Sequence, residues 1–482
     1  MTTTSSRPAD GASTAAAIHP HRIVAILAVG GIVVAMTQTL VVPIIASLPV
    51  IFDAPASQTS WIITVTLLVG AVCTPVSGRL GDLYGKKRML LVSLAPLALG
   101  SAVCAVATTV PVMVTGRALQ GLATGFIPLG ISMLHDLLPR ERTAGAIALM
   151  SASLGIGGAL GLPFAAAVAE LASWRILFWL VTACAVAVGL AVWRSVPAPA
   201  APARVRSRFD HIGVLGLAAG LVALLLAVSQ GADWGWGSPL VLGLFGGSVV
   251  VLLAWGRWEL RTADPLVDLR TTARPAVLLT NLASILVGFA MYAQSLILPQ
   301  LMQAPTATGF GLGQSMLQMG LWMAPSGLAM TLMSPVGARI TRARGPKTTL
   351  VVGGLVMALG YGLSTLAMGT LLGLATTAFV AAAGVGLAYG AMPAIILGSV
   401  PATEKAAANG FNALMRSIGT SASAAVVGVV LARMSTTVGE HTLPTENGFR
   451  VALLLGCGVA VVAAAVAAAI PARGRRDQAT SH

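Results

Sequence analysis

The stretch Gly78-Arg-Leu-Gly-Asp82-Leu-Tyr-Gly85-Lys86-Lys87-Arg88 is the most informative part of this sequence. It is a dense polar segment between two apolar runs, at about 60–77 and 89–107. Each run is close to the ~20 residues that a helix needs to cross a ~30 Å hydrocarbon core. Its glycines allow backbones to approach closely, its aspartate can accept charge-assisted hydrogen bonds, and its cations can face a membrane surface. The stretch therefore predicts a tight loop between two membrane-spanning helices.

The composition indicates a helical membrane protein. Of the 482 residues, 56% are hydrophobic and only 9% are charged, whereas a soluble domain carries about a quarter charged residues. The formal net charge is +14, but the cations stand in short segments between apolar runs, which suits membrane topology and argues against a nucleic-acid partner. The four cysteines all lie in apolar segments and form neither a disulfide framework nor a metal-ligand pattern. We therefore expect no metal and no cofactor, and a lipid bilayer as the surroundings.

The apolar runs define the organisation of the chain. We count fourteen of them, and Lys and Arg concentrate in the loops and tails on one side, which the positive-inside rule assigns to the cytoplasm. Both termini are therefore predicted to be cytoplasmic. The predicted order is a disordered cytoplasmic tail (1–21), an N-terminal six-helix half (22–196), a cytoplasmic linker (197–211), two extra transmembrane helices (212–257), a second cytoplasmic linker (258–275), a C-terminal six-helix half (276–470) and a cytoplasmic tail (471–482).

An internal repeat supports the division into halves. The segment Pro75–Lys87 recurs without a gap as Pro335–Lys347, with Pro, Val, Arg, Gly and Lys matching in place. Two halves in the same orientation around a site at the midplane are typical of a transporter. The copies differ at one informative position, because Arg342 stands where the first half has Asp82. This difference predicts that only the first half carries an acidic gate residue.

Several motifs resemble the major facilitator superfamily. Gly78–Arg88 resembles its motif A, Arg117-Ala-Leu-Gln120-Gly121 resembles its motif B, and Trp174–Phe178 resembles its drug-efflux branch. With fourteen predicted helices, the chain is most similar to the fourteen-helix drug:proton antiporter group. The resemblance implies an all-α polytopic membrane protein with the major-facilitator fold, two six-helix halves and two inserted helices. It also implies a small-molecule substrate that is exchanged for protons.

Two positions depart from the pattern of that group. Its first helix usually holds Asp-x-Thr, where this chain has Thr37-Gln38-Thr39. Its helix-five antiporter motif, Gly-Pro-x-x-Gly-Gly, is replaced by Gly157-Gly-Ala-Leu-Gly161-Leu-Pro163, with a shifted proline and alanines for the glycine pair. Alanine is still small, so we expect close packing of helix five to survive. The departure keeps an uptake carrier or facilitator without proton antiport open as an alternative.

Motif A is expected to form the gate. Asp82 is predicted to cap the start of a helix in the second half, or to pair with an arginine such as Arg416, when the cytoplasmic side is closed. The alternative is a solvated loop acid. Lys86 is expected to pair with Asp136, which resembles the acidic partner of the motif A cation. The other candidate gating residues are Gly78, Gly85, Lys87 and Arg88, and, in the second half, Arg339 and Arg342.

Charged side chains are rare inside the apolar runs. Arg117 lies within one, and such a cation usually faces a cavity or a partner. We favour a role in proton-linked coupling or substrate contact, and an anchor to backbone carbonyls is the alternative. Gln120 is its expected neighbour on the same helix face. No Asp or Glu lies at the middle of any run, which favours neutral, zwitterionic or anionic substrates over strongly cationic ones, and Arg117 would suit an anion.

Polar and aromatic side chains in the central runs are candidates for a substrate cavity. They share a place within the first, ninth and tenth apolar runs. The candidates are Thr37, Gln38, Asn281, Tyr292, Gln294, Gln318 and Trp322.

The sequence thus predicts a secondary active exporter of small lipophilic drugs or antibiotics in the cell membrane. We expect it to act as a monomer, by alternating access and in exchange for protons. No Gly-x-x-x-x-Gly-Lys-Ser/Thr segment is present, so an ion gradient must supply the energy. An enzyme or a non-transporting ligand sensor is less favoured, because the sequence shows neither a large soluble segment nor a convergent Ser/His/Asp set.

Overall fold

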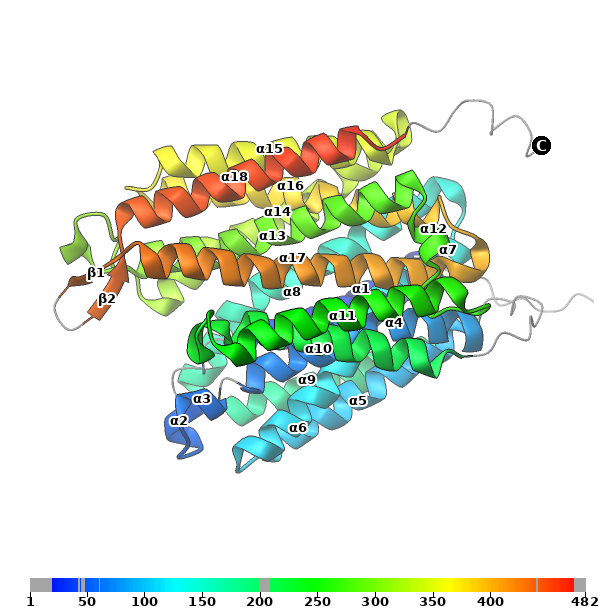
Figure 1. The fold of residues 1–482 in the computed structure, drawn as a ribbon, viewed down its shortest axis with the longest axis horizontal. Helices are drawn as coiled ribbons and strands as arrows, with labels where there is room; N and C mark the ends of the chain where they lie inside the picture. Colours follow the sequence, from blue (N-terminus) through cyan, green and yellow to red (C-terminus); the bar gives the residue numbers. More distant parts are fainter. Residues whose placement is uncertain are drawn as a thin grey trace, which may run out of the picture.

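The computed structural model describes residues 20–41, 44, 48–59, 61–198, 209–438 and 441–471. Over these residues the chain forms long helices that run side by side along one axis, with a short β-hairpin at one end (Figure 1). The predicted tails, apart from residues 20, 21 and 471, and the middle of the linker at 197–211 lie outside the described residues.

The first group of helices packs around a core of its own. That core includes Leu27, Phe126 and Met150, all fully shielded from solvent. Its elements are α1 (Pro20–Thr39), α2 (Leu48–Ile51), α3 (Ala56–Thr59), α4 (Trp61–Tyr84), α5 (Lys86–Val106), α6 (Val110–Gly121), the 3₁₀ helix η2 (Leu122–Gly125), α7 (Phe126–Leu137), α8 (Arg140–Leu171) and α9 (Trp174–Ser195).

The second group has a separate core, which includes Ala290, Met357 and Phe449. Its elements are α13 (Pro275–Gln303), η3 (Thr306–Thr308), α14 (Met316–Arg344), α15 (Pro346–Leu366), α16 (Leu371–Leu397), η4 (Ala402–Glu404), α17 (Lys405–Arg433), β1 (Ser435–Val438), β2 (His441–Pro444) and α18 (Glu446–Ala468). Strands β1 and β2 pair antiparallel and form the hairpin.

Between the two groups lies an inserted pair, α10 (His211–Trp234) and α11 (Pro239–Arg261), followed by the short α12 (Leu269–Thr272). Asp210 caps the start of α10, because its carboxylate accepts a hydrogen bond from the backbone N–H of Gly213 (2.8 Å). The same carboxylate accepts a hydrogen bond from Nε1 of Trp258 on α11 (3.0 Å). Helix α10 packs against α11, α4 and α17. Helix α11 exposes Leu253 (70%) and Val250 (66%), as expected of a helix that faces lipid.

The two copies of the repeat adopt the same backbone shape. Gly85 (φ +97°) lies between α4 and α5, and Gly345 (φ +85°) holds the same place between α14 and α15. Glycine reaches positive φ readily because it has no Cβ, so one helix can stop and the next begin within one residue. The predicted repeat is present in the structure.

Twelve helices in the described part of the chain are long and apolar enough to cross a membrane, and α10 and α11 are among them. Two further segments fall outside this set. The 3₁₀ turn Leu122–Gly125 divides α6–η2–α7 into two short helices, and α14 has 29 residues but is less apolar. Length and composition therefore support twelve spans, two fewer than the fourteen counted from the sequence.

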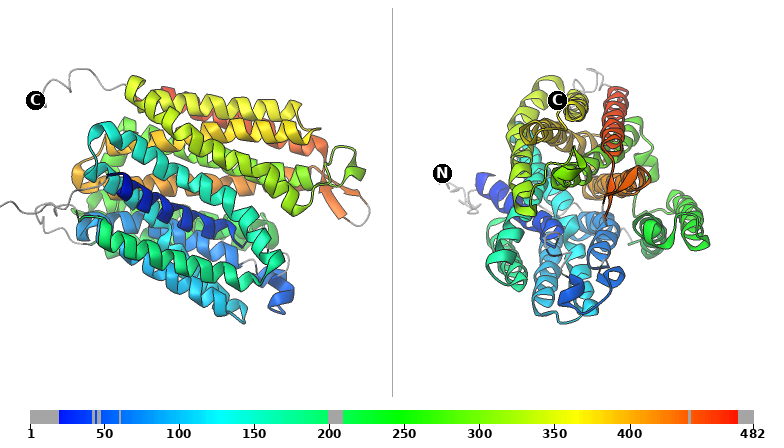
Figure 2. Two further views of the ribbon diagram at one scale, coloured as in Figure 1. Left: turned by 180° about the vertical axis from the view of Figure 1, so that it is seen from behind. Right: turned by 90° about the vertical axis from the view of Figure 1, so that its left-hand side faces the viewer.

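The halves meet along two seams. Helix α4 packs on α17 at one seam, and α8 packs on α14 and α16 at the other. The right-hand view of Figure 2 looks along the bundle, with the first half (blue to cyan) opposite the second (yellow to red) and the inserted pair (green) outside, next to α4 and α17. We refer to these contacts as the α4/α17 seam and the α8/α14 seam.

Close packing of α13 on α17 yields a test of this arrangement. A Cβ on Gly419 would lie 1.9 Å from the carbonyl oxygen of Ile285, whereas a Cβ on Gly428 of the same helix would meet no atom within 4 Å. We expect Gly419→Val to lower the free energy of unfolding by about 3 kcal/mol and Gly428→Val to leave it close to wild type. Thermal unfolding of the detergent-purified variants measures both. Equal midpoints for the two variants would contradict the packing.

Candidate functional site

Asp82 connects the two halves at one end of the bundle. It lies near the end of α4, and its carboxylate accepts hydrogen bonds from the backbone N–H groups of Ala406 (3.2 Å) and Ala407 (2.9 Å). Both N–H groups belong to the first turn of α17. The Asp82 side chain is only 3% exposed. Of the two partners considered for Asp82, the start of a helix in the second half is therefore the one in contact.

The physical basis of this contact is the free end of a helix. The first N–H groups of a helix have no partner within it, and the helix dipole adds a partial positive charge there. A partly buried carboxylate at such a site stabilises the contact by up to about 2 kcal/mol. Small residues allow the approach, because a Cβ on Gly78 would lie 2.4 Å from the carbonyl oxygen of Ala406.

A second acidic residue joins the same helix start. Asp136, which follows the apolar run at 111–134, forms an ion pair with Lys86 and another with Lys405 of α17 (Nζ to Oδ1, 3.4 Å). We call the contacts of Asp82 and Asp136 with the start of α17 the latch.

Lys405 is a part of the latch that the sequence analysis did not include among the gating residues. Its ammonium lies 3.2 Å from Nδ1 of His135 as well as close to Asp136. A signal was available, since the segment Leu138–Arg142 has a second-half counterpart in Val400–Lys405, which ends on Lys405. Among the other motif A cations, Lys87 donates to the carbonyl oxygen of Trp193 (2.8 Å) and Arg88 is exposed.

The corresponding contact at the α8/α14 seam is weaker. Arg342 takes the place of Asp82 in the repeat, is exposed, and donates from Nη1 to the carbonyl oxygen of Glu141 at 3.4 Å. Arg339 is also exposed, whereas Arg79, its first-half counterpart, is buried. Among the described residues, the carboxylate contact between the halves thus occurs at the α4/α17 seam and not at the α8/α14 seam.

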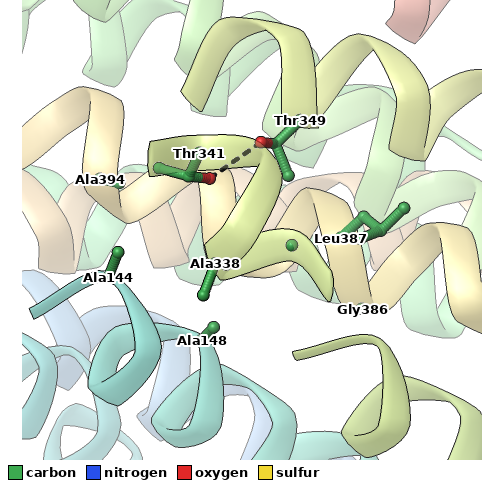
Figure 3. A pocket seen from close by; sticks show the side chains of 10 residues that line it. Ala144, Ala148, Ala338, Thr341, Thr349, Gly386, Leu387 and Ala394 are labelled. Atoms are coloured by element: carbon green, nitrogen blue, oxygen red, sulfur yellow. Dashed lines mark hydrogen bonds between the residues drawn. The ribbon is translucent and has the colours of Figure 1, made fainter. Parts of the chain in front are cut away.

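A small pocket lies beside this weaker contact. Small side chains of α8, α14 and α16, such as Ala148, Ala338 and Ala394, line it (Figure 3). A hydrogen bond of 2.8 Å between the hydroxyls of Thr341 and Thr349 closes one wall. This side of the seam is therefore lined by small side chains and a pair of hydroxyl groups.

Arg117 is fully buried and bound to backbone carbonyls. Its Nη1 donates to the carbonyl oxygen of Thr37 (2.8 Å) and to Oε1 of Gln120 (2.7 Å), and its Nε donates to the carbonyl oxygen of Ile62 (3.1 Å). Gln120 in turn donates to the hydroxyl of Ser101 (2.8 Å). These contacts tie α6 to α1, α4 and α5. They match the anchor alternative, and the expected pairing of Arg117 with Gln120 is present.

The glycines of the first half serve helix packing. A Cβ on Gly157 would lie 2.4 Å from the Cβ of Ala35, and a Cβ on Gly161 would lie 2.0 Å from Oγ1 of Thr39, so α8 lies directly on α1. Gly121 has the same role against α4. Pro163 stands inside α8, which continues to Leu171. Close packing of this helix is therefore present despite the altered motif.

The cavity candidates do not form one group. Thr37 donates to the carbonyl oxygen of Val34, and Gln294 donates to that of Ala378 (3.0 Å), so both are buried in helix contacts. Gln318 is exposed and forms the capping box of α14 with Ser315. That placement corrects its assignment to a cavity, and the spacing Ser315-x-x-Gln318 is a sequence signature of such a cap. The three partly buried candidates are Gln38, Tyr292 and Trp322.

Arg416 and Asn281 belong to one buried polar network in the second half. Nη1 of Arg416 donates to Oδ1 of Asn412 (2.8 Å), and Nδ2 of Asn412 donates to Oδ1 of Asn281 (2.9 Å) and to the hydroxyl of Ser284 (2.7 Å). The Arg416 guanidinium lies over the ring of Tyr389, 5.0 Å from its centroid. The sequence analysis named Arg416 and Asn281 but neither Asn412 nor Tyr389.

This geometry defines a helical membrane protein of two packed halves that a polar contact joins at one end. The model of the Major Facilitator Superfamily matches residues 27–211 and 280–481. The chain belongs to this superfamily, whose members are membrane transporters and not enzymes. The interval between the matched segments holds α10, α11 and α12.

Several curated relatives share this family. An uncharacterized MFS-type transporter of Mycobacterium tuberculosis is 30% identical over 62% of this chain, which spans only 44% of that protein. The tetracenomycin C resistance and export protein of Streptomyces glaucescens is 26% identical over 84% of this chain and 75% of its own length. The multidrug transporter protein MdtP of Bacillus subtilis is 24% identical, over 80% and 71% respectively.

Solved structures agree on the fold. The human organic anion transporter MFSD10 superposes with a TM-score of 0.66 at 15% identity, over 93% of this chain and 99% of that one. The proton:xylose symporter XylE gives a TM-score of 0.61 at 12% identity, over 92% and 94%. At such identities the likeness concerns the fold alone.

The Arg117 contacts predict a structural effect. Arg117→Ala removes the donors that pair the carbonyl oxygens of Thr37 and Ile62, and it leaves buried acceptors unsatisfied. We expect the free energy of unfolding to fall by about 3 kcal/mol. Arg450→Ala, which breaks an exposed pair with Glu446 (2.9 Å), should change it by less than about 1 kcal/mol. Unfolding midpoints in detergent compare the two, and an unchanged midpoint for Arg117→Ala would refute the anchor role.

We expect substitutions at Asp82 and at Arg342, its counterpart in the repeat, to change opening of this end of the bundle to different extents. Asp82→Asn removes the negative charge from the start of α17, and we expect about tenfold more molecules open at this end. Arg342→Gln should change that population much less, because its contact is long and exposed. The reporter is maleimide labelling of a cysteine replacing Ala148, which is buried in the pocket wall, in a background without native cysteines.

A matched control removes a carboxylate that lies far from the latch in the sequence and is exposed. Glu446→Gln lies in an exposed pair on α18 and should leave the labelling rate at its wild-type value. Equal labelling of the Asp82 and Arg342 variants would show that the two seams do not differ in strength.

Proposed function

We propose that this chain is a secondary active exporter of small lipophilic drugs or antibiotics, which it exchanges for protons across the cell membrane. The observation that carries the proposal is the latch, a buried carboxylate of one half bound to the start of a helix in the other. Such a contact can hold one end of the seam closed and be broken as a unit when that end opens. Export as the direction draws on the relatives, among them a resistance and export protein and a multidrug transporter.

The proposed topology places the latch in the cytoplasm, with both termini on that side. The basic residues support it, because the latch end of the bundle carries Arg140 and Arg142 in the first turn of α8, Arg274 before α13 and Lys347 in α15. We also propose that α6–η2–α7 and α14 cross the membrane, which makes fourteen spans. The segment α6–η2–α7 runs along the bundle beside α4, and α14 runs beside α15. Both α4 and α15 are long and apolar enough to cross a membrane.

In the proposed cycle the halves rock about the seams. With the latch made, the cytoplasmic end is closed and cargo can leave on the outer side. Opening inward requires loss of the two hydrogen bonds of Asp82 and of the Asp136–Lys405 ion pair. The separate hydrophobic cores of the two halves support movement of each as a unit. A monomer suffices for this cycle.

An uptake carrier or facilitator of the same superfamily is the second candidate. Pro163 stands away from its usual place in the antiporter motif, and no acid lies at the middle of a helix among the described residues. Both observations weaken the argument for proton exchange without affecting the fold. Transport in a defined membrane separates the two candidates.

The test uses inside-out vesicles from a pump-deficient bacterial host that expresses the chain. We expect a proton gradient, acid inside, to drive uptake of lipophilic antibiotics or dyes, and an ionophore that collapses the gradient to abolish it. The same host should become more resistant to those compounds, and Asp82→Asn should remove that resistance while the protein remains in the membrane.

Glu446→Gln serves again as the control and should transport like wild type. Uptake that ignores the proton gradient would favour the facilitator. Wild-type transport by Asp82→Asn would remove the latch from the mechanism.

A further inference from the structure

Arg117 and Arg416 are both buried inside helices of the bundle, and they differ in how their donors are used. Arg117 is 1% exposed and gives three hydrogen bonds to fixed groups of α1, α4 and α6. Arg416 is 8% exposed, and its one hydrogen bond to a described residue goes to Asn412. A guanidinium carries five N–H donors. The N–H groups of Arg117 therefore serve contacts between helices, whereas Arg416 has N–H groups that can donate to a further partner.

The place of Arg416 within α17 makes its remaining N–H donors notable. It lies eleven positions after Lys405, where α17 begins, which corresponds to about 16 Å along the helix axis. That distance places Arg416 well inside the helix, away from the charged residues of the latch at its start. A cation at such a depth is costly and usually marks a substrate or ion pathway. Among the described residues, no carboxylate lies within 4.0 Å of the Arg416 guanidinium.

The position of the guanidinium is fixed by its surroundings. A Cβ on Gly288 would lie 2.4 Å from the carbonyl oxygen of Arg416, so the backbone of α17 is pressed against α13 at this point. The side chain extends instead to the ring of Tyr389 on α16. The next residue of α16, Gly390, approaches α8, because a Cβ on Gly390 would lie 3.2 Å from the Cβ of Ala148. The arginine thus lies close to where the second half meets the first.

The neighbours of Arg416 leave one edge of its guanidinium group free to donate hydrogen bonds to a ligand. Tyr389 covers a face of the guanidinium, and a cation over a ring is attracted without using its N–H groups. Asn412 donates to Asn281 and Ser284, which turns its oxygen towards Nη1 of Arg416. The Nε and Nη2 edge has no hydrogen bond to a described residue. Two parallel donors on such an edge match the two oxygens of a carboxylate.

We propose that Arg416, seated on Tyr389 and oriented by Asn412, binds the acidic group of an organic anion, so that the exporter's cargo includes lipophilic carboxylates. The proposal rests on the proposed export function and names the chemistry of its substrate. It replaces Arg117, which the sequence alone had favoured for an anion. The apolar surroundings of the site, including Met291, whose sulfur lies 3.1 Å from the Tyr389 hydroxyl, suit the hydrocarbon part of such a molecule.

The test compares matched probes on the purified protein. Each probe pair is an aromatic carboxylate and the amide of the same skeleton, naphthoate with naphthamide and pyrenebutyrate with its amide, and the readout is the Kd from ligand-dependent thermal stabilisation. We expect at least one carboxylate to bind wild type about tenfold or more tightly than its amide, because a charge-assisted pair is lost in the amide. Arg416→Gln should lose that preference and keep its affinity for the amide, and Arg416→Lys should retain part of it.

Controls separate charge recognition from folding. Arg433→Gln, at the exposed outer end of the same helix, should keep the full preference. The unfolding midpoint without probe shows whether each variant is folded, and the Lys variant provides a conservative second test. A carboxylate that binds no better than its amide, including the case in which neither binds, contradicts the proposal, as does a preference that survives Arg416→Gln. Because binding is measured without transport, failure of export would leave this result intact.

Discussion

The contact between the Asp82 carboxylate and the first turn of α17 is the interaction on which this architecture depends. It joins the two halves through polar groups, beside apolar contacts that also cross between them, since Ala406 of α17 packs in the core of the first half. The glycines on both helices matter for the same reason. A side chain at Gly78 or at Gly410 would separate α4 from α17, and the carboxylate would no longer reach the N–H groups.

Arg117 and Arg416 illustrate that burial alone does not identify a binding group. Arg117 and Arg416 both lie inside apolar helices, but their partners differ in kind. Arg117 donates hydrogen bonds to carbonyl oxygens of two neighbouring helices and thereby holds these helices together. An aromatic face and a single amide hold Arg416, so its charge is positioned without being neutralised. A side chain of the second type is preorganised for a ligand.

Much of this could be predicted from the sequence, because the repeat and motif A are local patterns. The capping role of Asp82 follows from its charge and from the known attraction of helix starts for anions. Partners that depend on the register between distant helices could not be predicted, and Lys405 and Tyr389 are examples. The 3₁₀ turn at Leu122–Gly125 was also missed, since no proline marks it. Gln318 was misassigned although Ser315 gave the signal of a cap.

The inserted pair makes the two seams of the molecule unequal towards the bilayer. Helix α10 touches α4 of the first half and α17 of the second, so it lies across one seam, and among the described residues no additional helix lies in the same way across α8 and α14. In the proposed cycle, rocking of the halves would slide one of these helices past α10, while the opposite seam would move against lipid. The proposed lipophilic cargo would then approach from the membrane more freely on the α8/α14 side, which neither α10 nor α11 covers.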